Sequence, residues 1–526
     1  MIRIGTVILA AGALTLALAA PLRAQPADLE TMLKSYGFQL KQEGDRRVVE
    51  VTLHQILQLA LERNLTLQSV RVGETIASSA LEAARGRFNP TLTNTAGYTK
   101  TVTPSSSVTP NTFASVSAAS VYTLSSELTK PTGTGIEYGL KYTEKQSKLG
   151  VSTIPSDGAE AEPFTTGTEV GVSALTGSVT VPIGQDFGSD FNAIPFRRAE
   201  AGLTGSQLTT RQNELTLLQN TASTYWDLVA ALENVRVQED AVKLSEQLLA
   251  DNQQRLQAGV LSPFDVQVTE TQLARERQTL LSARADVLRI EDLARALLNL
   301  QVIDFQVRPL DRPQVHDVSL NYDALLQKVF DNSPDIKQLE NSLLTNSLDL
   351  QEAENKDRTN LDFEMFYTLQ GVKGSPFGGV SGFNQTNLDS YGATLTWTVP
   401  LFDAQTRESI RQRTLERERL RLQLESRRSD LTVSLQGVIR QIKVARDQVD
   451  TAGVARRLAE EQLRNEIERF RVGESTSFQV AQSQQDAASA QVQEILARLT
   501  FERNYLQLLA LTGDIYSRYD LQRSQQ

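Results

Sequence analysis

The chain has 526 residues, of which 22% are charged, with a formal net charge of −10 at pH 7 and no cysteine. The acidic balance argues against nucleic acid as a partner, and the lack of cysteine excludes disulfides, thiolate metal sites and a cysteine-linked lipid. The two histidines, His54 and His316, lie far apart in the sequence and do not suggest a metal or catalytic site. We therefore expect neither an enzyme nor a cofactor.

The N-terminal segment, residues 1–24, is typical of a secretory signal peptide. Arg3 supplies the positive charge, residues 4–20 form an apolar run, and Ala24 is the small residue before the expected cleavage site. No later run of 18 or more apolar residues is present, so the sequence predicts an exported chain without a transmembrane helix. The next segment, residues 25–52, is polar and weakly patterned, which predicts an extended or partly helical lead-in.

Two short helices are predicted in residues 53–88 and again in residues 320–357. In the first segment, apolar residues recur on one helical face until Asn64 interrupts the pattern. In the second, the interruption is Asn332-Ser-Pro-Asp-Ile336, after which a new helix begins. This recurrence indicates an internal duplication of one structural unit.

After each pair of short helices the hydrophobic period changes from that of a helix to that of a strand. The second copy has two alternating runs within residues 361–401, each with the length that a tilted strand needs to cross a bilayer. A half-buried hairpin of a soluble protein is the alternative interpretation. The side chains expected to face lipid are Leu361, Phe363, Met365, Tyr391, Leu395 and Trp397.

The first copy has a longer segment at this place, residues 91–183. Its ends resemble the two strands of the second copy, and the part between them is rich in Ser, Thr and Gly, with one further alternating run. The helices on both sides must return to the same side of a membrane, so the number of strands is two or four. We expect two strands, with residues 100–170 forming an extracellular extension.

Long helical hairpins are predicted in residues 195–300 and 403–512, where apolar residues alternate at spacings of three and four, as in coiled coils. Each hairpin has a Gly near its tip, Gly259 or Gly473, followed by a hydroxyl residue. Gly tolerates the left-handed conformation that ends a helix, and a hydroxyl can cap the next one. The arginine-rich part of the second hairpin, residues 407–428, is interpreted as a solvated helix face.

The predicted units are thus one repeat over residues 53–300, a linker over 301–319, a second repeat over 320–513 and a C-terminal tail over 514–526. In each repeat, the returning helix and the short helix directly before the strands together have about the length of the long helix. One chain with four strands cannot close a pore, because the smallest transmembrane barrels have about eight strands. Closure therefore requires several copies of the chain.

These features together resemble the outer-membrane efflux protein (TolC) family. The residues that carry the resemblance are the tips Arg255-Leu-Gln-Ala-Gly-Val-Leu-Ser262 and Arg469-Phe-Arg-Val-Gly473, the strand exit Val399-Pro-Leu-Phe-Asp403, and the break Asn332-Ser-Pro-Asp-Ile336. The resemblance covers essentially the whole chain after the signal peptide. The order and the duplication of these motifs are more specific than any one of them.

The resemblance implies a mainly α fold with a β membrane part: a homotrimer whose 12-stranded transmembrane β-barrel, surrounded by outer-membrane lipid, continues into a periplasmic tunnel of helices. Such a trimer would be the outer-membrane exit duct of a tripartite efflux pump or a type I secretion system. It would conduct cargo passively from a periplasmic adaptor and an inner-membrane pump. A soluble periplasmic coiled-coil scaffold or a pump adaptor is the alternative function.

The resemblance also assigns residues to roles. Family members often close the periplasmic entrance with acidic rings after the second tip; here Gln479 and Gln482 hold those positions, and Asp265 holds the equivalent place in the first repeat. Because threefold symmetry makes each lumen side chain a ring, and acidic rings favour cations, we expect weaker cation selectivity than in relatives with acidic rings. The residues expected to dock the adaptor are Gly259, Val260, Leu261, Ser262, Val472, Gly473 and Glu474.

Overall fold

A computed structural model describes residues 39–43, 46–105, 112–155, 165–299, 305–373, 388–399, 401 and 403–521. The expected signal peptide, most of the expected lead-in and most of the Gly-rich loop between the last two strands lie outside the described residues. The chain divides into two compact units. Unit 1 comprises Met1–Gln68, Glu214–Leu326 and Leu435–Gln526, and unit 2 comprises Ser69–Asn213 and Gln327–Ser434.

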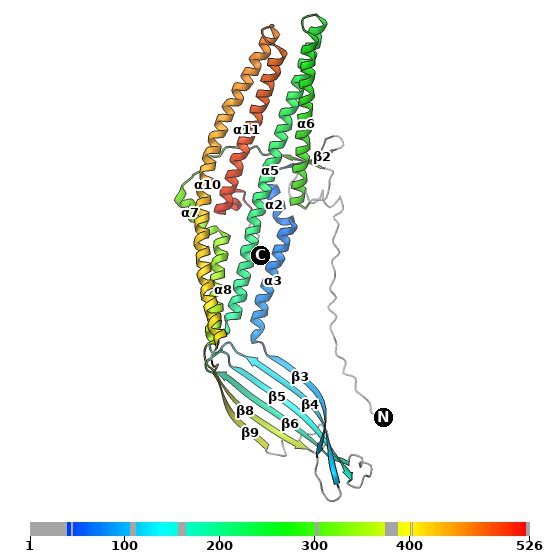
Figure 1. Cartoon of the computed structure of the whole chain (residues 1–526), viewed down its shortest axis with the longest axis vertical. Coiled ribbons are helices and arrows are strands. Elements are labelled where there is room, and N and C mark those ends of the chain that lie inside the picture. The colour runs from blue at the N-terminus through cyan, green and yellow to red at the C-terminus, as the bar shows by residue number, and fades with distance from the viewer. Residues whose placement is uncertain are drawn as a thin grey trace. The chain divides into compact units, whose positions relative to one another are not determined.

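Short helices precede the strands of both repeats (Figure 1). They are α2 (Leu53–Arg63) and α3 (Leu65–Arg85) in the first repeat, and α7 (Tyr322–Asn332) and α8 (Pro334–Lys356) in the second. Polar side chains cap the helices that follow each break. Asn64 Oδ1 accepts the Leu67 N–H at 3.0 Å, and Ser333 caps α8 with Pro334 in its first turn. Both breaks therefore end one helix and begin another.

Four long helices form the two hairpins that the sequence predicts. They are α5 (Ile194–Gln257) and α6 (Pro263–Leu297), then α10 (Ala404–Arg471) and α11 (Ser477–Thr512). Most residues at three- and four-residue spacing in α5 and α10 are buried, whereas Phe478 at the start of α11 is exposed. In unit 1, Leu218 and Ala222 of α5 and Leu435 of α10 are fully buried. Among the described residues, no helix has both the length and the apolar character needed to cross a membrane.

The strands of unit 2 form one six-stranded sheet in the order β3-β4-β5-β6-β8-β9. All neighbouring pairs are antiparallel. The strands are β3 (Thr91–Ser105), β4 (Thr112–Pro131), β5 (Glu137–Pro155), β6 (Thr165–Pro182), β8 (Asn360–Lys373) and β9 (Leu388–Thr398).

The expectation of two strands around an extension in residues 91–183 is wrong, because the segment contributes four strands to the sheet. Strand β4 pairs with β3 down to the contact of Thr91 with Thr129, and β5 pairs with β6 down to the contact of Glu137 with Thr180. The turn between β4 and β5 therefore lies at the helical end of the sheet. The Ser- and Thr-rich composition concealed β4, since its alternation lies among small polar residues.

One face of the six-stranded sheet is apolar along its whole width. The register places Phe363 opposite both Val181 and Leu395, and Tyr98 opposite Tyr122 with the ring centroids 4.7 Å apart. The register places the following residues on this face: Leu92, Tyr98, Tyr122, Leu128, Leu140, Val179, Val181, Leu361, Phe363, Met365, Tyr391, Leu395 and Trp397. The opposite face is rich in threonine, as where Thr176 Oγ1 lies 2.9 Å from Thr368 Oγ1.

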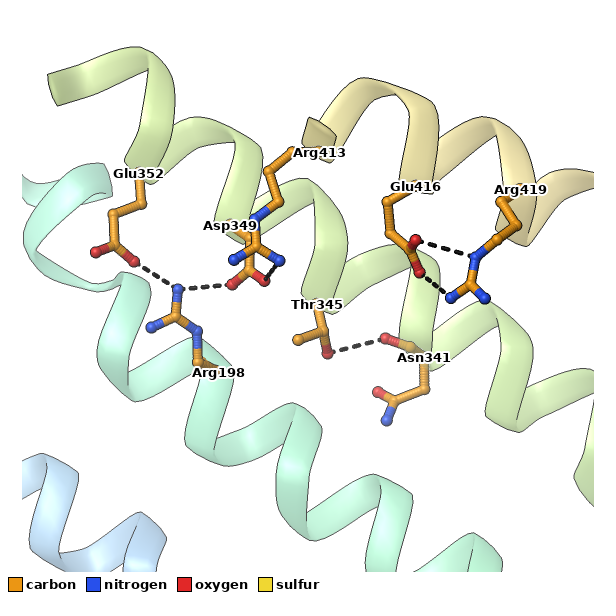
Figure 2. Close-up of polar contacts among 8 residues, drawn as sticks. All are labelled: Arg198, Asn341, Thr345, Asp349, Glu352, Arg413, Glu416 and Arg419. Atoms are coloured by element: carbon orange, nitrogen blue, oxygen red, sulfur yellow. Dashed lines mark hydrogen bonds and ion pairs between the residues drawn. The ribbon is translucent and has the colours of Figure 1, made fainter. Parts of the chain in front are cut away.

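Ion pairs join three helices of unit 2 (Figure 2). The Arg198 guanidinium of α5 reaches Asp349 of α8 at 2.7 Å and Glu352 at 2.6 Å. From α10, Arg413 reaches the same Asp349 at 3.2 Å. The hydrogen bond from Arg198, opposed by burial, holds the pKa of the Glu352 carboxyl below its usual value. In the arginine-rich segment of α10, Arg427 pairs with Asp335 and Arg428 with Glu340 of α8. Part of the segment that was interpreted as a solvated face therefore contacts a neighbouring helix, while Arg419 pairs with Glu416 of its own helix.

A second, three-stranded sheet lies in unit 1, in the order β1-β2-β7. Strands β1 (Gln39–Glu43) and β2 (Arg46–Val51) come from the expected lead-in, and β7 (Phe305–Pro309) comes from the expected linker. Strand β2 pairs with β7 in parallel. The expected lead-in and the expected linker therefore both contribute strands to this sheet. Each strand is too short to be recognised alone, and β2 and β7 lie more than two hundred residues apart in the sequence.

The core of unit 1 gathers both repeats around this small sheet. It contains side chains of β2, α2, α5 and α11 and of the C-terminal segment. The expected C-terminal tail is not a tail within the described residues, because helix α12 (Ile515–Arg518) buries Ile515 completely. The Tyr516 hydroxyl also donates to Glu214 Oε2 at 2.9 Å.

Candidate functional site

The tip of the first hairpin is a helix end closed by a left-handed glycine. Gly259 has φ of 73°. Its N–H donates to Leu256 O at 3.0 Å, and the Val260 N–H donates to Arg255 O at 2.9 Å. This pair of bonds is a Schellman motif, which satisfies carbonyl groups at the end of α5 that have no partner within the helix.

The tip of the second hairpin repeats this arrangement. Gly473 has φ of 84°. Its N–H donates to Phe470 O at 3.2 Å, and the Glu474 N–H donates to Arg469 O at 2.8 Å. The glycine roles inferred from the sequence are therefore confirmed at both tips. A side chain at either glycine would meet no atom within 4 Å, so only the backbone conformation favours glycine there.

Both returning helices begin with a capping box. Ser262 Oγ accepts the Asp265 N–H at 3.3 Å, and Asp265 Oδ2 accepts the Ser262 N–H at 3.2 Å. Thr476 and Gln479 make the same reciprocal pair at 3.3 Å and 3.2 Å. Two residues that the sequence assigned to the channel entrance, Asp265 and Gln479, thus also hold the first turns of α6 and α11.

Apolar side chains are exposed at the tips. Val260 is 70% exposed, Val472 71%, Phe264 69% and Phe478 65%. Gly259, Ser262, Gly473 and Glu474 are exposed as well, whereas Leu261 is partly buried. Phe264 and Phe478 stand at equivalent places of the two repeats, and Val260 and Val472 are each next to a tip glycine. Four exposed apolar side chains gathered in this way indicate a binding surface. We call Val260, Phe264, Val472 and Phe478 the apolar tip residues.

Sequence reasoning gave Phe264 no role and placed Phe478 in the heptad pattern of the returning helix, where it would be packed against a neighbour. The structure instead exposes both side chains. Both stand at the second position of a helix, directly before the capping residue Asp265 or Gln479. An apolar side chain at this solvent-facing position contributes nothing to the cap. The signal in the sequence was the retention of phenylalanine in both repeats.

Polar contacts tie the two hairpins together near the tips. The side-chain nitrogen of Asn252 on α5, which is fully buried, donates to Thr269 Oγ1 on α6 at 2.7 Å and to Ser477 Oγ on α11 at 2.9 Å. Further from the tips, the side-chain nitrogen of Gln484 on α11 donates to Ala241 O on α5 at 2.6 Å. Such buried bonds fix the register between packed helices more sharply than apolar contact does.

Arg255 adds a contact that its counterpart Arg469 does not make. Its Nη1 donates to Phe470 O at 3.1 Å, and its guanidinium lies 4.5 Å from the centroid of the Phe470 ring. Phe470 packs in a small buried cluster with Leu248 of α5. Arg469 instead pairs with Glu466 of its own helix at 3.3 Å. The first tip is therefore fastened to the second hairpin through one arginine.

The other predicted site residues lie in two places. Gln482 is exposed on α11 and donates to Asp486 Oδ1 at 3.1 Å. On the apolar face of the sheet, Tyr391 is 80% exposed, Trp397 71%, Leu395 59% and Met365 46%, while Leu361 and Phe363 are partly buried.

Two titratable groups in unit 1 lie close together. The Glu502 carboxylate is 2% exposed and lies 3.7 Å from His316 Nε2; it also accepts the Gln314 N–H at 3.2 Å. Burial raises the pKa of Glu502 to about 7, with small opposing effects from Gln314 and Arg518. Within the described residues, no group of three or more His, Asp or Glu side chains is placed to hold a metal ion.

Three solved structures share the fold of this chain at low sequence identity. A membrane protein from Pseudomonas aeruginosa aligns with a TM-score of 0.64 at 14% identity, over 88% of this chain and 92% of that one. The CmeC outer membrane channel of Campylobacter jejuni aligns with a TM-score of 0.62 at 15% identity, over 91% and 87%. The outer membrane protein VceC of Vibrio cholerae aligns with a TM-score of 0.59 at 15% identity, over 88% of this chain and 95% of that one.

At the level of sequence, no curated protein matches this chain. The profile of one family, described as outer membrane efflux protein, matches residues 160–299 and 325–514. The two matched segments contain both long hairpins with their tips, together with β6, β8 and β9. The chain belongs to the outer membrane efflux protein family.

Proposed function

We propose that this protein is the outer-membrane exit duct of a tripartite efflux pump or a type I secretion system. The observation that carries the proposal is the six-stranded sheet of unit 2, with one apolar face and with β3 and β9 at its two ends. In hydrocarbon, every backbone polar group needs a partner, so an open sheet edge cannot face lipid. Six strands are also fewer than the smallest barrels contain. The sheet therefore has to close against other copies of the chain.

The barrel we propose is a homotrimer in which β9 of one copy pairs with β3 of the next. Three copies of six strands would supply 18 strands, not the 12 expected from the sequence, and two copies would supply 12. We favour three because members of this family are trimeric channels. Leu361, Phe363, Met365, Tyr391, Leu395 and Trp397 would then face outer-membrane lipid.

The hairpin tips are the proposed docking surface for a periplasmic adaptor, which would connect the duct to an inner-membrane pump. The exposed apolar tip residues support this role. Val260 and Val472 are among the docking residues named from the sequence, and Phe264 and Phe478 lie close to them in the chain. The named docking residues are Gly259, Val260, Leu261, Ser262, Val472, Gly473 and Glu474. Asp265, Gln479 and Gln482 would lie at the entrance. A soluble periplasmic scaffold or adaptor is disfavoured, because it would leave the apolar face of the sheet in water.

The test is the mass of the particle that detergent releases from the outer-membrane fraction. We expect a particle that stays with the membrane until detergent is added and that contains three chains, each with a mass of 58.1 kDa before removal of any signal peptide. A two-chain particle would require a 12-stranded barrel and would overturn the trimer alone. A protein that leaves with the soluble periplasm would overturn the duct.

A further inference from the structure

A cavity of about 330 Å³ lies within unit 1, between one face of α5 and one face of α11. From α5 it is lined by Trp226, Val229, Ala230, Glu233, Arg236 and Val237. From α11 it is lined by Gln491, Glu494, Ile495, Arg498 and Leu499, and Arg456 of α10 and the residues Arg312 and Pro313 complete the wall. Such a volume suits a small organic molecule.

The charges around the cavity are unequal. Four guanidinium groups line it against two carboxylates, those of Glu233 and Glu494. Glu494 holds Arg498 at 2.6 Å and also pairs with Arg456, and Arg456 reaches Glu460 at 2.8 Å just outside the lining. When Glu460 is included, one positive charge remains in excess.

Arg236 and Arg312 are the two arginines of the cavity lining that are not ion-paired within the described part of the chain. Both side chains are exposed, and neither has an ion pair with any of the described residues, whereas Arg456 and Arg498 do. An exposed guanidinium that no carboxylate holds is free to bind the oxygens of an anionic group.

One buried side chain of the cavity lining, Trp226, has a polar atom without a partner among the described residues. Trp226 is 6% exposed, and its ring packs edge-on against Tyr225 at a centroid distance of 5.4 Å. Its indole Nε1 is buried and has no hydrogen-bond partner among the described residues. Buried tryptophan N–H groups usually have an acceptor, so this one needs an acceptor from beyond the described residues, which a ligand can supply.

We propose that this cavity binds a small amphipathic organic anion. The apolar body of the ligand packs against Val229, Ile495 and Leu499. Its carboxylate, sulfonate or sulfate group accepts hydrogen bonds from Arg236 and Arg312, and a second acceptor on the ligand takes the N–H of Trp226. We call this the anion cavity. It lies outside the tips and the sheet, and it goes beyond the proposed duct function.

The test uses the fact that the chain has only two tryptophans. The variant Trp397→Phe leaves Trp226 as the only tryptophan, so its fluorescence reports on the anion cavity. The full-length protein in nanodiscs of zwitterionic lipid is titrated with 8-hydroxyoctane-1-sulfonate, whose hydroxyl supplies the second acceptor. The same alkyl chain is then presented without a charge as 1,8-octanediol and with a positive charge as (8-hydroxyoctyl)trimethylammonium.

We expect a saturable change in Trp226 emission with 8-hydroxyoctane-1-sulfonate but not with the two other compounds. In the same background, Arg236→Gln and Arg312→Gln should each weaken this binding by about threefold to tenfold, because each removes one charge-assisted hydrogen bond. Arg440→Gln, which removes an exposed guanidinium of α10 away from the cavity, is the matched control and should bind as the parent does.

Three results would overturn the proposal. An equal response to all three compounds would show apolar partitioning. Unchanged binding in both arginine variants would remove the charged recognition. No response at all would mean that another group, such as a side chain of a neighbouring copy, already fills the cavity. Circular dichroism and particle mass of each variant must match the parent, so that loss of fold is not mistaken for loss of binding.

Discussion

Asn252 on the first hairpin and Ser477 at the start of α11 are joined by a hydrogen bond of 2.9 Å between the Asn252 side-chain nitrogen and Ser477 Oγ. The same nitrogen also donates to Thr269 Oγ1 on α6. One side chain therefore connects three helices just behind the two tips. Its fully buried position means that water cannot replace either bond without opening the packing.

Replacing Asn252 should loosen the tips selectively. In Asn252→Leu, two buried hydroxyls lose a donor, at a cost of about 1–3 kcal/mol in local stability. Hydrogen–deuterium exchange should then be faster in the first turns of α6 and α11 and unchanged in the strands of unit 2. Gln253→Ala, at the neighbouring exposed position, is the control. Equal exchange in Asn252→Leu and the control would contradict a connecting role.

The tip glycines should be sensitive to a single added methyl group, although there is room for it. In Gly259→Ala or Gly473→Ala, the residue must keep a positive φ, which costs an L-residue about 1–2 kcal/mol. Amide exchange at that tip should rise by about fivefold or more. Gly437 of α10 also has open space around it but no positive φ. Gly437→Ala should therefore stabilise its helix slightly, by up to about 1 kcal/mol. If Gly437→Ala destabilised the protein as much as the tip variants do, the positive φ could not be the reason for their effect.

The position of Gln479 allows a clean test of ion selectivity, which rests on the proposed duct. Gln479 accepts the Thr476 N–H in its capping box, and Asp265 accepts the Ser262 N–H at the equivalent place of the first repeat. Gln479→Asp therefore keeps the cap and adds a carboxylate ring in a trimer. In planar bilayers with a salt gradient, the reversal potential should shift toward cation selectivity.

The matched control for this experiment is Asp265→Asn, which also preserves the capping geometry but removes a charge. Its reversal potential should shift in the opposite direction if Asp265 faces the lumen. A reversal potential that Gln479→Asp leaves unchanged would mean that position 479 is not at the entrance.

Burial of Glu502 should make the stability of unit 1 depend on pH. The pKa of this carboxyl is raised to about 7 from an ordinary value of 4.5, so the folded state binds a proton that the unfolded state has released. The stabilising effect of this proton is full below about pH 4.5 and is lost as the pH rises to about 7. His316 has the opposite tendency, because burial and Arg518 lower the pKa of its imidazole.

Glu502→Gln should remove the loss of stability that unit 1 suffers at high pH, while keeping an acceptor for the Gln314 N–H. We expect the variant to be more stable than the parent at pH 8, by about 1–3 kcal/mol, and similar to it at pH 5. Thermal unfolding followed by circular dichroism at both pH values measures this. Glu270→Gln, which changes an exposed carboxylate of α6, should leave both transitions in place. If the difference in stability between Glu502→Gln and the parent were the same at pH 5 and at pH 8, the raised pKa of Glu502 would be ruled out.

Local chemistry in the sequence determined the helices, the tips and the apolar strands of the second repeat. The Gly259 and Gly473 turns, the Ser262 and Thr476 caps and the alternation at Leu361, Phe363 and Met365 depend on neighbours within a few residues, so short patterns reveal them. The duplication is more specific than any single motif, because the same pattern recurs in the same order in both repeats.

Only the tertiary structure decided which distant segments meet. Strand β4 has an alternation diluted by Ser, Thr and Ala, and β2 and β7 are short strands whose pairing depends on a partner far away in the chain. The burial of Ile515 and the meeting of Arg236, Arg312 and Trp226 at one cavity likewise depend on how long helices pack. Sequence periodicity tells which face of an element is apolar, whereas the partner of that face is set by the packing of the whole unit.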